Sequence, residues 1–107
     1  MARTARSTLL LGRRSARTRK LCRIADAARD RKDWSIACNY YRQAVETSPA
    51  AFHIWVQLGH AAKEMQNFGA AAEAYKAAER LDPDDIDLKI EMGHFDKMLN
   101  PRDEASL

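Results

Sequence analysis

The chain has 107 residues, a length that suits one small domain with a thin core. Hydrophobic residues make up 46% of it, with many alanines but only four Gly and three Pro, and this composition favours helices. No apolar run approaches the roughly 20 residues that a membrane helix needs, and the leucines at 9–11 are too few for the apolar core of a secretory signal.

The first part of the chain carries most of the positive charge. Residues 1–24 contain seven Arg, one Lys and no acid, whereas residues 25–107 contain ten basic and fifteen acidic residues and so carry −5. We expect residues 1–17 to form a disordered basic tail. An Arg- and Ser-rich start without acids is also typical of transit peptides, so import into an organelle is the alternative to a cytoplasmic location. No aromatic side chain lies among these arginines to stack on bases, so specific nucleic-acid binding is not expected.

Two later stretches share one helical pattern, and the second copy follows the first at a constant shift in the sequence. Each has apolar residues at three- and four-residue steps, a polar break, a second such run and a closing proline, which ends the second helix. The nine matched pairs are Leu21 and Trp55, Ile24 and Leu58, Ala25 and Gly59, Ala28 and Ala62, Trp34 and Phe68, Ala37 and Ala71, Tyr41 and Tyr75, Ala44 and Ala78, and Pro49 and Pro83.

This pattern resembles the tetratricopeptide repeat family. A helix-turn-helix unit with a period of about 34 residues, the shift found here, is typical of that family. The W-x2-L-G core of the family is present as Trp55, Leu58 and Gly59. The resemblance implies an all-α fold, a right-handed stack of helical hairpins, with one repeat at residues 18–51 and a second at residues 52–85. It also implies a non-catalytic scaffold that binds other proteins or peptides.

Residues 86–107 begin a third unit without completing it. Ala105 falls one repeat period after Ala71, as expected of a partial third repeat. Lys89 and Asp96, however, break the apolar pattern, as expected of a terminal helix that caps the second repeat. Both interpretations remain open. Because three or more repeats usually give stability, we also expect self-association through the exposed ends of the stack.

The small and aromatic residues have physical roles that do not depend on the family. Gly59 and Ala71 are small where the two helices of a hairpin approach most closely, since large side chains would hold the axes more than about 8–10 Å apart. Tyr41 and Tyr75 should fill the space between hairpins, with a hydroxyl that can reach water or a partner. We expect the ring of Trp55 to be buried.

The sequence holds few groups that could carry chemistry. Cys22 and Cys38 are the only cysteines, and we expect free thiols. His53, His60 and His94 have no Cys or carboxylate at a spacing that completes a tetrahedral set, so neither metal nor cofactor is expected. There is no G-x-S-x-G elbow, phosphate loop or dinucleotide fingerprint. We therefore expect a protein that is not an enzyme.

By resemblance to the repeat family, a partner segment would bind the concave face, which the first helix of each repeat lines. Asp87 and Glu91 stand where repeats that grip a C-terminal carboxylate carry Lys and Arg, so no such grip is expected. The implied lining is Arg19, Cys22, Arg23, Asp26 and Arg29 in the first unit, His53, Val56, Gln57, His60 and Lys63 in the second, and Asp87, Ile90, Glu91, His94 and Lys97 in the third.

A second resemblance leads to a different function. The stretch I-W-V-Q-L-G-H-A-A-K-E at residues 54–64 is similar to the repeat segments that precede the catalytic domain in bacterial sugar transferases. It implies an accessory segment of a glycosyltransferase whose active site lies outside this chain. The reading frame beyond Leu107 separates this alternative from a free-standing binding module.

Overall fold

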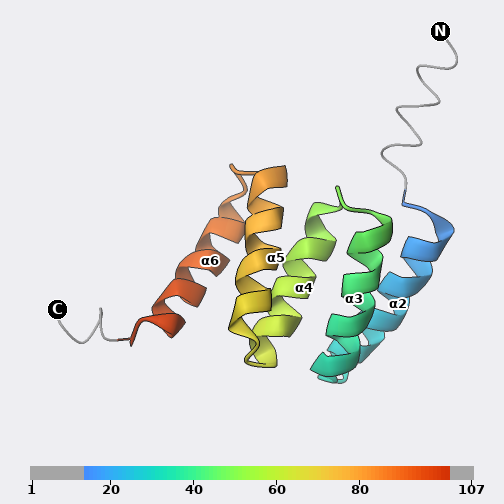
Figure 1. Cartoon of the computed structure of the whole chain (residues 1–107), viewed down its shortest axis with the longest axis horizontal. Coiled ribbons are helices and arrows are strands. Elements are labelled where there is room, and N and C mark those ends of the chain that lie inside the picture. The colour runs from blue at the N-terminus through green and yellow to red at the C-terminus, as the bar shows by residue number, and fades with distance from the viewer. Residues whose placement is uncertain (1–13, 102–107) are drawn as a thin grey trace, which may run out of the picture.

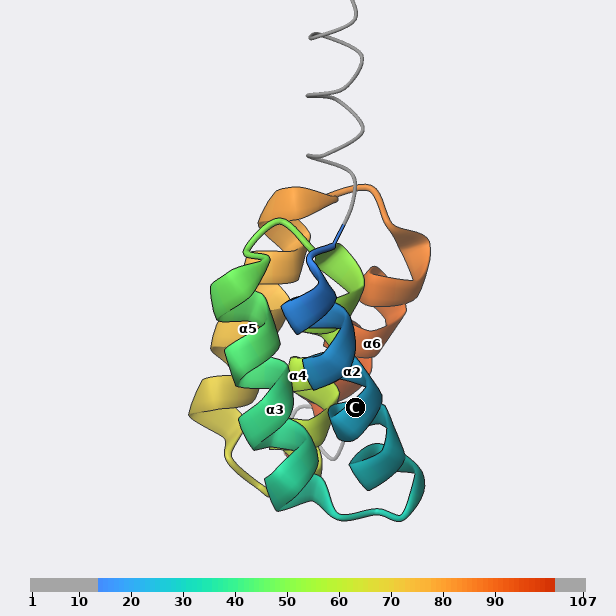
Figure 2. The same cartoon turned by 90° about the vertical axis from the view of Figure 1, so that its right-hand side faces the viewer.

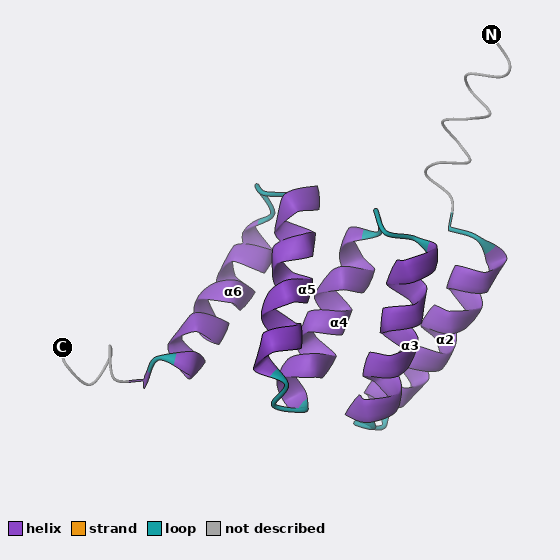
Figure 3. Cartoon of the chain, viewed as in Figure 1, coloured by secondary structure: helices purple, strands orange, loops and turns teal. Residues whose placement is uncertain are grey.

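The chain forms a row of helices over residues 14–101, which are the residues that the structure describes (Figure 1). In this computed structural model, those residues fold into five helices and contain no strand (Figure 3). The helices are α2 (Ala16–Asp30), α3 (Trp34–Thr47), α4 (Phe52–Glu64), α5 (Phe68–Leu81) and α6 (Ile86–Leu99). The predicted all-α stack of hairpins is confirmed. The predictions for residues 1–13 and 102–107 lie outside the described residues.

Successive helices pack on one another along the stack. Short turns join α2 to α3 and α4 to α5 as two hairpins, and α6 follows the second (Figure 1). Contacts also join α3 to α4 and α5 to α6. Viewed along the row, α3 and α5 lie on one side, and α2 and α6 lie on the other (Figure 2). The first helices of successive units therefore share a face that differs from the face of the second helices.

The two hairpin turns have the same backbone shape. Lys32 and Gln66 stand at equivalent positions of the two repeats and have φ angles of 62° and 63°, a left-handed conformation that is uncommon without glycine. In each turn the next amide donates back to a carbonyl of the last helical turn, as in a Schellman motif. These bonds join Asp33 to Ala28 at 2.8 Å and Asn67 to Ala62 at 2.9 Å. The two units therefore share the backbone conformation of the turn as well as their apolar spacing. The sequence pattern shows these turns only as polar breaks.

The core is built from small residues around two buried tyrosines. Tyr41 and Tyr75 are 1% and 0% exposed. A Cβ atom added to Gly59 would lie 2.7 Å from two ring atoms of Tyr75, so the close neighbour that requires this glycine is the tyrosine of the opposing helix. Seven alanines within residues 14–101 have no exposed surface, which allows close helix packing. They are Ala25, Ala28, Ala37, Ala44, Ala62, Ala71 and Ala78.

Trp55 is less buried than the repeat pattern predicts. Its side chain is only half-buried, and its indole Nε1 donates a hydrogen bond to the carbonyl oxygen of Pro49 at 2.7 Å. The indole therefore ties α4 to the loop after α3 instead of filling the centre of the core. The expectation of a buried ring is wrong, because spacing indicates the face of a helix and not the depth of a side chain.

A group of hydroxyls joins the start of α2 to the end of α3. The helix begins at Ala16, two residues before the repeat boundary that we expected at Thr18, and the Ser15 side chain caps it by accepting from the Thr18 amide at 3.1 Å. Thr18 is fully buried, and its hydroxyl lies 2.9 Å from that of Ser15 and 2.8 Å from that of Ser48. Apolar spacing did not predict this contact, because all of its members are polar.

The last helix, α6, buries only two residues against the rest of the stack, Leu88 and Phe95. The Phe95 ring lies 5.4 Å from the ring of Tyr75 and 6.2 Å from that of Phe68. Ile86 and Ile90, on the opposite side of the helix, are 71% and 53% exposed. One face of α6 thus docks on the second repeat, and an apolar face remains in solvent.

Candidate functional site

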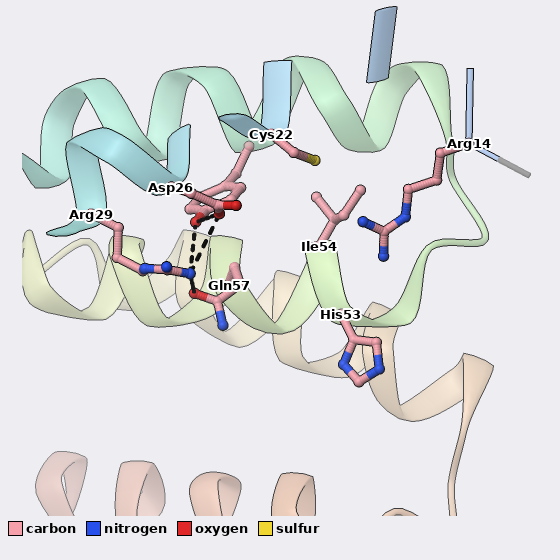
Figure 4. A pocket seen from close by; sticks show the side chains of 8 residues that line it. Arg14, Cys22, Asp26, Arg29, His53, Ile54 and Gln57 are labelled. Atoms are coloured by element: carbon pink, nitrogen blue, oxygen red, sulfur yellow. Dashed lines mark hydrogen bonds and ion pairs between the residues drawn. The ribbon is translucent and has the colours of Figure 1, made fainter. Parts of the chain in front are cut away.

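Three shallow hollows lie along α2, α4 and α6, and together they form the candidate site. The first lies between α2 and α4 and has a volume of about 210 Å³ (Figure 4). The second, of about 310 Å³, extends from α2 across α4 to α6, and the third, of about 130 Å³, lies between α4 and α6. The first is lined by Arg14, Cys22, Asp26, Arg29, Tyr41, His53, Ile54 and Gln57, the second by Arg29, Val56, Gln57, His60 and Glu91, and the third by Phe52, His53, Val56, Asp85, Asp87, Leu88 and Glu91.

The hollows share walls, so they form one continuous surface that we call the α2–α4–α6 groove. Arg29 and Gln57 line both the first and the second hollow. Val56 and Glu91 line both the second and the third, and His53 borders the first and the third. Since residues of α4 line all three hollows, this helix forms the middle of the groove, with α2 and α6 at its two edges.

Most of the residues predicted to line the concave face lie in this groove. Lys63 reaches it through Glu91, with Lys63 Nζ and Glu91 Oε1 3.4 Å apart. Nine predicted residues line the hollows: Cys22, Asp26, Arg29, His53, Val56, Gln57, His60, Asp87 and Glu91. The other five are exposed and do not line these hollows: Arg19, Arg23, Ile90, His94 and Lys97.

Six lining residues were not predicted. Tyr41 lies on the second helix of its hairpin, but its hydroxyl reaches the groove, whereas the family resemblance implied a lining from first helices alone. Arg14 and Asp85 precede α2 and α6, and residues outside a helix carry no periodic signal. The remaining three are Phe52, Ile54 and Leu88.

Polar bonds join α2 to the next hairpin on the floor of the groove, in a set that we call the first polar cluster (Asp26, Arg29, Tyr41 and Gln57). The Tyr41 hydroxyl donates to Asp26 Oδ1 at 2.5 Å. Arg29 Nη1 lies 3.4 Å from the same oxygen and donates to Gln57 Oε1 of α4 at 3.3 Å (Figure 4). Burial and the hydrogen bond to Asp26 raise the pKa of Tyr41 well above its usual range. The hydroxyl therefore stays protonated and remains a donor.

A second polar cluster (His60, Lys63, Tyr75 and Glu91) joins α4 and α5 to α6. The Tyr75 hydroxyl donates to Glu91 Oε1 at 3.0 Å, and Lys63 Nζ lies 3.4 Å from that oxygen. His60 Nδ1 lies 3.6 Å from it. Burial alone would raise the pKa of Glu91, but the bond from Tyr75 and the charge of Lys63 outweigh it, so the pKa is lowered. Glu91 is therefore a carboxylate at neutral pH.

The two polar clusters occupy equivalent positions of the repeat. One repeat period maps Tyr41 to Tyr75, Arg29 to Lys63, Asp26 to His60 and Gln57 to Glu91. Each cluster thus has a buried tyrosine, a cation and a carboxylate, but the carboxylate moves from the earlier helix to the later one. In the first cluster the tyrosine donates to an acid of the preceding helix, α2, and in the second it donates to an acid of the following helix, α6. The charge therefore changes along the groove.

Several other predictions concern the chemistry of the described residues. Cys22 and Cys38 are buried free thiols, as predicted. Burial raises the pKa of the Cys22 thiol. Within residues 14–101, no group of His, Cys, Asp or Glu gathers closely enough to hold a metal ion. In the same span no helix is long and apolar enough to cross a membrane.

The second hairpin also has a counterpart among known protein families. Residues 52–85, which hold α4 and α5, match the family model described as Tetratricopeptide repeat. No curated protein matches the chain significantly. The match is to one repeat at residues 52–85, about a third of the chain, and the first hairpin repeats its buried alanines and tyrosine and the conformation of its turn.

Proposed function

We propose that the chain is a non-catalytic module for protein interaction, in which the α2–α4–α6 groove receives a segment of a partner protein. The observation that carries this proposal is the continuity of the three hollows across successive units. Polar clusters at both junctions hold the walls together, so the groove exists before a partner arrives. A preformed site keeps the entropic cost of binding low.

Val56 gives a direct test, because it lies on α4 where two of the hollows meet. We expect peptides selected on the parent protein from a displayed random library to bind the Val56→Arg variant about tenfold or more weakly, since the long side chain would obstruct the groove. Ile36→Arg is the matched control, because Ile36 lies on α3 and is 37% exposed, outside these hollows. Fluorescence anisotropy measures each affinity, and circular dichroism melts check the fold.

The same experiment separates groove binding from attraction to the basic N-terminal residues. Attraction by exposed charges falls steeply between about 0.05 M and 0.5 M salt, whereas contacts in a hollow change less. Equal weakening by Val56→Arg and Ile36→Arg at both salt concentrations would contradict the proposed function. Shortening the chain to residue 20 is a poor substitute, because it would remove the Ser15 cap and the buried Thr18.

The exposed face of α6 supports a second role, self-association with another copy of the chain. Ile86, Ile90 and Gly93 share this face, and Gly93 is equivalent to Gly59, which packs on Tyr75 within its hairpin. No second helix of the described residues covers the face. We expect the parent protein to dimerise in sedimentation velocity at about 100 μM and the Ile90→Lys variant to stay monomeric. A parent that is monomeric at that concentration would contradict this role.

Two further proposals rest on the sequence. The accessory segment of a bacterial glycosyltransferase remains the alternative function, and a reading frame that continues beyond Leu107 into a catalytic domain would support it.

We propose a cytoplasmic location, because Cys22 and Cys38 are free thiols. Organelle import with cleavage near Lys20 would remove Ser15 and Thr18, which hold the start of α2. N-terminal sequencing of the mature protein decides between the two locations.

A further inference from the structure

The α2 edge of the groove is positively charged. Arg14 and Arg29 line the first hollow. Arg19 and Arg23 are exposed on α2 and lie three residues before Cys22 and Asp26, so they extend the same side of the helix. Asp26 and Asp30 are the acids of this edge: Asp26 Oδ1 accepts from Tyr41 and Arg29, and Asp30 Oδ1 accepts from Arg29 at 3.1 Å, so two acids stand against four arginines. The net charge that a ligand meets here is therefore positive.

The α6 edge of the groove is negatively charged. Asp85, Asp87 and Glu91 line the hollow between α4 and α6. Lys63, the cation in contact with this set, is already paired with Glu91. Lys97 lies ten residues beyond Asp87 on α6, which places it about 15 Å further along the helix. A ligand that reaches the start of α6 therefore meets carboxylates.

Between the two edges, α4 offers a less charged floor. His53, Val56 and Gln57 line it and connect the hollows. A helix with its side chains is about 10 Å wide, so α2 and α6, on either side of α4, are separated by about 20 Å. An extended chain advances about 3.3 Å per residue and crosses that distance in about six residues.

We propose that the groove binds an extended peptide segment of mixed charge, with its acidic residues against the arginines of α2 and its basic residues against Asp85 and Asp87. A small apolar residue of the segment would lie over Val56. This inference rests on the proposed function and adds the kind of partner and its orientation. A wholly acidic or wholly basic segment would place like charges together at one edge, which costs affinity and slows association. A nucleic-acid strand would meet the carboxylates of the α6 edge in the same way.

Two peptides of identical composition test the polarity of the groove, by which we mean the positive charge of its α2 edge and the negative charge of its α6 edge. One is about eight residues long, with a block of glutamates, then alanine and leucine, then a block of lysines. Its isomer alternates glutamate and lysine around the same centre. We expect the block peptide to bind the full chain about tenfold more tightly than its isomer at low salt, and the difference to shrink at high salt. Equal affinities would overturn the polarity.

Charge reversal on the protein gives an independent test of the same polarity. Arg19→Glu combined with Arg23→Glu, and separately Asp87→Lys, should each weaken binding of the block peptide severalfold. All three changes together should restore much of the affinity, because the peptide can then bind in the opposite direction. All three positions are exposed, so the fold should tolerate the changes. A combined variant weaker than either partial variant would overturn the proposal.

The outcomes separate this inference from the proposed function. If neither designed peptide binds but library peptides still depend on Val56, the polarity is overturned and groove binding stands. If the Val56→Arg change weakens the binding of no peptide, both the polarity and the proposed groove binding are overturned. A poly-dT strand that binds more tightly than the block peptide and loses affinity with the α2 charge reversal would overturn the peptide in favour of nucleic acid.

Discussion

Replacing Tyr75 by alanine should lower the free energy of unfolding by about 3–5 kcal/mol, as expected for a buried aromatic side chain. Tyr75 is fully buried, and its ring packs edge to face on Phe95 of α6. Truncation would leave a void where α4, α5 and α6 meet, which packed helices fill only in part. A domain of this size has a total stability of about 5–15 kcal/mol, so the variant should be close to unfolding.

Urea denaturation followed by circular dichroism measures this loss, and Tyr75→Phe is its matched control. The phenylalanine keeps the ring but removes the hydroxyl that donates to Glu91, while Lys63 and His60 still face that carboxylate. We expect a loss of about 1 kcal/mol for this variant. If alanine and phenylalanine were equally destabilising, the hydrogen bond rather than the buried ring would hold α6, contrary to the packing described here.

The repeat period predicted much of the fold because it reports which residues share a helix face. Ala71 is fully buried at a position where we expected a small residue, and so are Ala25 and Ala37, which match Gly59 and Ala71 in the first repeat. Tyr75 reaches the next unit as expected. These features depend on the spacing of apolar residues within one helix and its neighbour. Such spacing can be read from a single sequence.

Features that depend on distances between units could not be predicted in this way. Three such features are the partial exposure of Trp55, the hydroxyl contacts of Thr18, and the position of the acid, which is Asp26 in one cluster and Glu91 in the other. Each depends on how helices that are distant in the sequence are placed. Polar residues also carry no periodic signal, because each could equally face solvent. The groove was therefore predicted as a set of helix faces, and its charged edges became apparent only from the arrangement of α2, α4 and α6.

Alanine at Gly59 should destabilise the fold even though alanine is the better helix former by about 0.8–1 kcal/mol. Its Cβ atom would lie 2.7 Å from Cδ1 and Cε1 of Tyr75, closer than packed carbon atoms allow. The ring cannot easily withdraw, because Phe95 packs against it and its hydroxyl is bonded to Glu91. We expect a net loss of about 1–3 kcal/mol, the usual range for overpacking, measured as a lower melting temperature.

The matched change at Gly93 should have the opposite sign. Gly93 occupies the equivalent position of α6, but a Cβ atom there would meet nothing within 4 Å among the described residues. Gly93→Ala should therefore gain only helix propensity, about 0.5–1 kcal/mol, and raise the melting temperature by several degrees. Two shifts in the same direction would contradict the packing of Tyr75 on Gly59. Opposite shifts would show that glycine is required at Gly59 by the Tyr75 ring, and that alanine is tolerated at Gly93, where no described residue packs on the position.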